Sequence, residues 1–126
     1  MLQEWTEPPP MRAGAAAPAL LSTDGTLWLA YRIARDPHHC AVVRFHHVQE
    51  YAWGAPPATY AAEVPGDLPR GSFYEVRSEE GEAAGARRWI ITFPEALLDV
   101  RAAEGEVVLR AAAALGPSHA LAALLA

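Results

Sequence analysis

The residues best suited to chemistry lie close together in the first half of the chain. His38, His39, Cys40, His46 and His47 fall within ten positions, and imidazole and thiolate are common zinc ligands. In an extended strand, however, His46 and His47 point to opposite faces, and Cys40 lies roughly 20 Å from His46. A metal site built from His38, His39, His46 and His47 would need a hairpin or a bulge to gather them. The spacing otherwise favours histidines at the surface or in hydrogen bonds.

Other patterns that could support catalysis are weak. Cys40 lies in an expected strand, where a lone cysteine usually serves as a small core residue. The stretch at residues 71–73 lacks the second glycine of a nucleophile elbow. The chain contains no lysine, so it can form no Schiff base. The sequence therefore favours a non-catalytic protein and assigns neither catalytic residues nor a cofactor.

Aromatic residues and one arginine surround a long proline- and glycine-rich connection at residues 54–71. The candidate binding residues of this group are Tyr51, Trp53, Tyr60, Arg70 and Tyr74. Exposed Trp, Tyr and Arg side chains dominate the binding energy of many protein interfaces. The alternative is that most of these aromatic side chains pack into the core. We therefore expect a protein-binding surface near this connection, and a homodimer through an unpaired edge strand is compatible with the same pattern.

Composition limits the partners and the setting of the protein. The net charge of −5 over 126 residues argues against general binding to nucleic acid and to anionic membranes. No stretch approaches the roughly 20 apolar residues that span a bilayer. A single cysteine and an acidic, proline-rich start without the features of a signal peptide favour a reducing, cytoplasmic location.

The first half of the chain predicts an N-terminal arm followed by several strands. Residues 1–18 are expected to form an extended, loosely held Pro/Ala-rich arm, which Trp5 can pin to a single β-rich domain at residues 19–126. Asp24-Gly25 predicts a tight hairpin between two strands within residues 19–33. Strands at 40–45 and 47–53 have no turn residue between them, so they are expected to form one long bent strand with a bulge near His46 and His47.

The second half of the chain alternates strands and turns. Residues 72–77 form a further strand, and residues 88–93, 97–101 and 106–110 predict a three-stranded meander in which Gly105 takes a left-handed turn position. Leucines at helical spacing follow Gly116-Pro117 and predict a short helix. The fold class expected is a mainly β, antiparallel barrel or sandwich of about seven to eight strands with one C-terminal helix.

Hydrophobic strand patterns at residues 27–31, 41–45, 48–51 and 88–93, with Gly54-Ala55-Pro56, resemble those of uncharacterised small bacterial β-rich proteins. Some proteins of this kind are immunity proteins that neutralise toxins. The resemblance implies a bacterial, non-enzymatic binding protein of immunity type and supplies no catalytic residues. The other function considered is a β-barrel that binds a small ligand or a metal ion.

Overall fold

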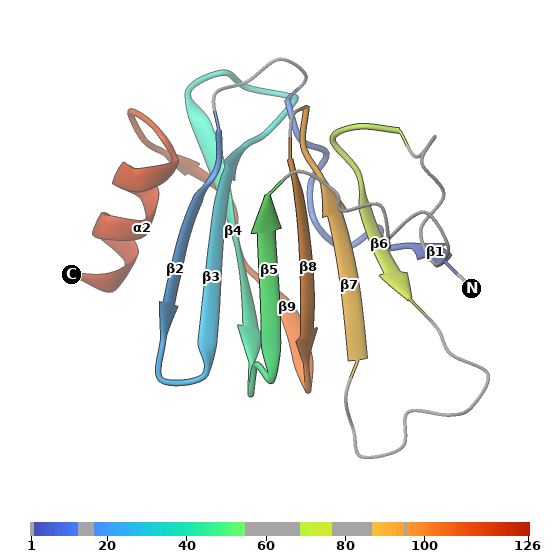
Figure 1. Ribbon diagram of the computed structural model, residues 1–126. Coiled ribbons are helices and arrows are strands. Elements are labelled where there is room, and N and C mark those ends of the chain that lie inside the picture. The colour runs from blue at the N-terminus through green and yellow to red at the C-terminus, as the bar shows by residue number, and fades with distance from the viewer. Residues whose placement is uncertain (1, 13–16, 55–68, 77–86, 95) are drawn as a thin grey trace.

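Alternation of apolar and polar residues produces nine strands and one helix in the part of the chain that the structure describes. The computed structural model describes residues 2–12, 17–54, 69–76, 87–94 and 96–126. Its elements are β1 (Leu2–Glu4), β2 (Ala19–Thr23), β3 (Thr26–Arg32), β4 (His39–His46), β5 (Glu50–Gly54), β6 (Phe73–Val76), β7 (Arg87–Thr92), β8 (Leu97–Ala102), β9 (Glu104–Ala113) and α2 (Pro117–Leu125). The expected mainly β class with one C-terminal helix is confirmed (Figure 1).

The strands form two antiparallel sheets that stack as a sandwich rather than closing into a barrel. One sheet has the order β1-β6-β7-β8-β5, and the other has the order β2-β3-β4-β9. Side chains that alternate along the strands meet between the sheets, including Leu29 and Phe45 from one sheet and Trp89 and Val100 from the other. These four side chains are fully buried, so this layer is the main core.

A bent pair of strands joins the two sheets. β4 pairs with β9 and β5 pairs with β8, so that the segments β4–β5 and β8–β9 run side by side across both sheets. At the bend, Ala103 N donates to His46 O at 3.0 Å and His47 adopts a φ of 53°. The chain therefore bends near His46 and His47, as expected. The expected single strand with a bulge at this point is wrong, because β4 ends at His46 and β5 begins at Glu50 in the other sheet.

The predicted meander at the end of the β region is only partly correct. β7 and β8 form the expected hairpin, but β9 pairs with β4 in the other sheet. Gly105 is not a left-handed turn residue; it lies opposite Phe45, and a Cβ there would be 3.0 Å from two Phe45 ring atoms and 3.1 Å from Trp89. The prediction failed because a glycine needed for close ring packing has the same sequence signature as a turn glycine.

The predicted hairpin at Asp24-Gly25 is confirmed. Thr23 pairs with Thr26, which leaves a two-residue loop, and Asp24 and Gly25 have φ values of 48° and 77°. Both positive values match the type I′ turn that favours Asp-Gly. This turn fixes the register of β2 against β3.

The outer face of the four-stranded sheet is covered by α2. Ala120 and Leu121 of the helix pack with Ala30, Cys40 and Val42 in a second buried cluster. A helix of nine residues is too short to be stable in isolation, so this apolar contact stabilises it. Among the described residues, no helix has the length and apolar character needed to cross a membrane.

Residues 2–12 of the predicted arm contact the rest of the protein. β1 pairs with β6, and Trp5 packs against Phe45, Phe73 and Trp89 with ring centroids 5.8–6.2 Å apart. Met11 forms a bridge with Ile33 and is buried. The expectation that Trp5 pins this segment is confirmed, and the described part of the arm is not loosely held.

Candidate functional site

Among the described strands, β5 is an edge strand, and it carries two exposed aromatic side chains. It lies at the end of the five-stranded sheet, and β8 is its one pairing partner among the described strands. Tyr51 is 44 % exposed and Trp53 is 41 % exposed. Because side chains two apart in a strand share a face, the two rings lie on the same side of β5. This arrangement offers backbone hydrogen-bonding groups beside an aromatic surface.

The register explains why these aromatic residues are only partly covered. Tyr51 pairs with Val100 and Trp53 pairs with Leu98, both of which are buried in the main core. The two rings therefore lie on the core-facing side of the sheet, but at its edge the opposite layer covers them incompletely. Trp53 packs edge-on against Phe93, with ring centroids 5.1 Å apart, so its orientation is fixed.

Of the other predicted binding residues, Tyr74 lies away from this surface. Tyr74 lies on the opposite face of the five-stranded sheet, where it packs half-buried against Ile90 and Leu97. Arg70 is exposed and precedes Gly71. Tyr60 lies outside the described residues. The structure thus brings together Tyr51 and Trp53 from the predicted set.

The four histidines predicted as metal ligands separate into two regions. His38 and His39 lie at the start of β4, where the backbone N–H of His38 and the Nδ1 of His39 contact the Asp36 carboxylate at 2.9 and 2.7 Å. These contacts, the His38 hydrogen bond first, lower the pKa of Asp36. His46 lies at the far end of the strand, and His47 is exposed at the bend.

His46 has acidic neighbours that the sequence did not indicate. Its direct partner across the sheet is Glu104, and its Nε2 atom lies 3.5 Å from Glu106 Oε2. These carboxylates come from β9, which is nearly sixty positions further along the chain. The alternation of Glu104 and Glu106 was the one available signal, because it places both on one face of a strand. That these glutamates lie beside His46 follows only from the register of β9 against β4 in the structure.

Cys40 is a core residue, as the sequence analysis expected. It is fully buried under α2, and burial raises the pKa of its thiol, an effect that the nearby Arg32 guanidinium opposes. A thiol that is shielded and held protonated is a poor nucleophile. Cys40 is therefore structural.

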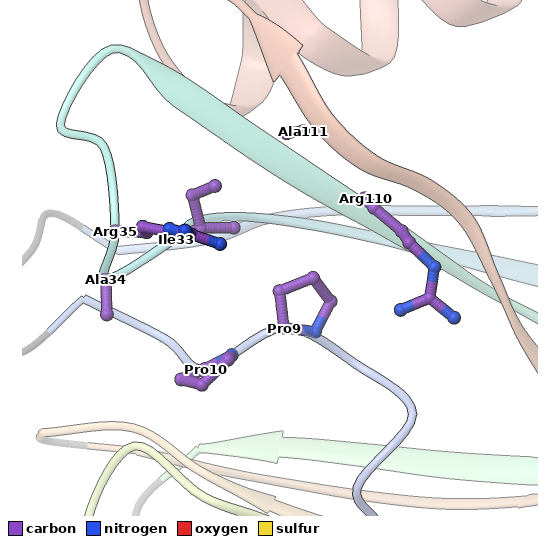
Figure 2. Close-up of a pocket in the computed structure, with 7 residues that line it drawn as sticks. All are labelled: Pro9, Pro10, Ile33, Ala34, Arg35, Arg110 and Ala111. Carbon is purple, nitrogen blue, oxygen red and sulfur yellow. The ribbon is translucent and has the colours of Figure 1, made fainter.

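A pocket of about 640 Å³ opens where the N-terminal segment crosses the end of β3. Its lining residues are Pro9, Pro10, Ile33, Ala34, Arg35, Arg110 and Ala111. Figure 2 shows Arg35 and Arg110 on opposite sides of this space, with Pro9 and Pro10 along the segment that passes below them. The walls are thus mainly apolar, and the two guanidinium groups supply positive charge.

Hydrogen bonds attach the N-terminal segment to the pocket. Arg110 NH1 donates to the Glu7 carbonyl at 2.9 Å, and the Tyr31 hydroxyl donates to the Pro9 carbonyl at 2.7 Å. Burial raises the pKa of Tyr31 well above its usual value, although the Arg110 guanidinium acts in the opposite direction. Tyr31 therefore stays a neutral donor and holds Pro9 in place.

No family model, curated protein or solved structure matches this chain.

Proposed function

We propose that this protein is a non-catalytic binding protein that recognises a protein partner through the edge strand β5. The observation that carries the proposal is the exposure of Tyr51 and Trp53, side by side, on a strand that lies at the edge of its sheet in the part of the chain that the structure describes. The partner contributes an extended segment that pairs with β5, while its side chains pack on the two rings. An immunity-type role, in which the partner is a toxin, is one form of this proposal.

Two physical arguments support recognition at this edge. The backbone groups at a sheet edge can pair with an added strand, and this mode of binding is used by several peptide-recognition domains. Exposed aromatic edges are normally blunted by charges or prolines because they promote unwanted pairing. In the described residues of β5 the one charged side chain is Glu50, which is held by Arg101 at 3.2 Å. The edge is therefore suited to pairing.

The chain offers a matched control for testing this surface. Leu21 lies on β2, which is an edge strand of the other sheet, and it is 41 % exposed, as Trp53 is. We expect immobilised wild-type protein to retain one stoichiometric partner from a lysate of the source organism. Trp53→Ala and Tyr51→Lys should abolish this retention, whereas Leu21→Ala should preserve it.

Two results would contradict the proposal. One is retention of the partner by both β5 variants, with circular dichroism indicating that they are folded. The other is a purified protein that forms a stable dimer which Tyr51→Lys dissociates, because a second copy would then occupy the edge. Sedimentation of the purified wild-type and variant proteins distinguishes this second case.

A second candidate function, the binding of a small anionic ligand, is favoured by the pocket in Figure 2. Arg35 and Arg110 face a mainly apolar space of about 640 Å³, which is within the size range of small-molecule sites. A ligand with an apolar body and a carboxylate or phosphate group would fit this chemistry. Thermal stabilisation by such compounds, lost in Arg110→Gln but not in Leu21→Ala, would support it; the absence of stabilisation across a panel of these compounds would contradict it.

A further inference from the structure

Three side chains of the types that bind metal ions converge on the outer face of the four-stranded sheet, on β4 and β9. His46, Glu104 and Glu106 each offer one ligand atom, and these atoms all lie within 4.8 Å of one another. His46 and Glu104 are directly paired, and Glu106 lies two residues further along the same strand, so all three share one face. A hydrogen-bonded pair of strands therefore fixes the spacing of their backbones.

Arg44 orients one of the carboxylates. Its guanidinium lies 5.1 Å from the centre of the Trp28 ring and hydrogen-bonds Glu106 Oε1. The second oxygen of Glu106, Oε2, is the one that faces His46 Nε2 at 3.5 Å. Ligating carboxylates are commonly held in this way by a hydrogen bond to the oxygen that does not bind the metal. Arg44 thus leaves one Glu106 oxygen directed towards the imidazole.

The charges of the group favour a cation. The Arg44 guanidinium is the cationic neighbour of Glu106, and glutamate carboxylates are ordinarily ionised near neutral pH. Two carboxylates against one guanidinium leave a net charge of −1 when the imidazole is neutral. A doubly charged ion would reverse this charge and replace the weak contact between His46 and Glu106.

We propose that His46, Glu104 and Glu106 bind a divalent transition-metal ion of the zinc type, with solvent in the remaining coordination position. An imidazole together with two carboxylates suits zinc or cobalt better than calcium or magnesium, which take oxygen ligands. Tetrahedral ligands about 2 Å from an ion lie roughly 3.3 Å apart, so the three side chains must move closer by small rotations. Glu104 is exposed and free to make the largest of these movements. This site is independent of the β5 edge.

The test is zinc titration by calorimetry on tag-free protein at a fixed pH of about 7.5, because metal affinity depends on pH. We expect one zinc ion per chain. When cobalt replaces zinc, the visible absorption spectrum should be that of a cobalt ion with a low coordination number. His46→Gln and Glu104→Gln should each weaken zinc binding about tenfold or more. His47→Asn is the matched control, because His47 is adjacent, exposed and at a positive φ of 53° that asparagine tolerates.

Several outcomes would overturn the metal site. The first is no zinc uptake at about 100 μM zinc, a concentration well above the dissociation constant of a functional site. The others are undiminished zinc binding by His46→Gln and loss of zinc binding by the His47→Asn control. Thermal unfolding of each variant without zinc shows whether the fold is preserved. Equal melting temperatures for wild type and His46→Gln would assign any loss of binding to the ligand itself.

Discussion

Replacement of Gly105 tests the packing between the two sheets. Gly105 lies opposite Phe45 in the sheet. A Cβ at this position would lie 3.0 Å from the Phe45 ring and 3.1 Å from the Trp89 ring, so a side chain does not fit without a shift of these rings. Both rings are fully buried and lie 5.2 Å apart, so they have little room to move. Gly105→Ala should therefore destabilise the protein, although alanine normally suits a strand better than glycine.

The size of the effect follows from two opposing contributions. Loss of glycine's backbone freedom in the unfolded state would stabilise the variant by about 0.5–1 kcal/mol, while overpacking a filled core costs about 1–3 kcal/mol. We expect a net loss of about 1–2 kcal/mol for Gly105→Ala and a larger loss for Gly105→Asn. At Gly25, where φ is 77° and a Cβ would meet nothing within 4 Å, the order should reverse and Asn should be better tolerated than Ala.

Urea denaturation, with the free energy of unfolding extrapolated to water, measures both pairs of variants. Phe45→Leu in the Gly105→Ala background should recover part of the loss, which would appear as coupling in a double-mutant cycle. A Gly105→Asn variant more stable than Gly105→Ala would refute the reasoning. That result would mean that residue 105 occupies a left-handed turn, as the sequence pattern suggested.

Three further predictions concern other parts of the core. Trp5→Ala should lower the free energy of unfolding by about 3 kcal/mol in urea denaturation, because its ring packs among three core aromatic rings; an unchanged stability would mean that the N-terminal segment is not attached. Arg88→Leu should lower the free energy of unfolding by about 3 kcal/mol, because the buried Asp99 carboxylate loses the guanidinium that contacts its two oxygens at 2.9 and 2.7 Å. The double variant with Asp99→Leu should recover most of this loss. Cys40 should react with a thiol reagent at the rate of global unfolding, since the thiol is buried and its pKa is raised; rapid reaction in native buffer would contradict this.

The local features of the fold could be predicted, but the pairing between distant strands could not. Asp24-Gly25 specifies its hairpin through positive φ values that few other residues accept. The bend at His46 and His47 was indicated by a continuous strand pattern without a turn. The strand with which β9 pairs could not be predicted, because the alternation of its side chains is compatible with pairing to either β8 or β4.

The candidate sites show the same division. Tyr51 and Trp53 share a face because they are two residues apart, which the sequence alone predicts. Their exposure depends on β5 being an edge strand, and the sheet face that Tyr74 takes depends on its pairing with Ile90 of β7. The acidic partners of His46 depend likewise on the register between β4 and β9.

Site-specific photo-crosslinking from β5 tests the proposed function most directly. A photoreactive phenylalanine analogue at position 53, in place of Trp53, should form a covalent adduct with one partner protein in a lysate of the source organism. The same analogue at position 21, in place of Leu21, should form none, although that side chain is equally exposed. An adduct from position 21 but not from position 53, or a product at position 53 containing two copies of this chain, would contradict recognition of a protein partner at the β5 edge.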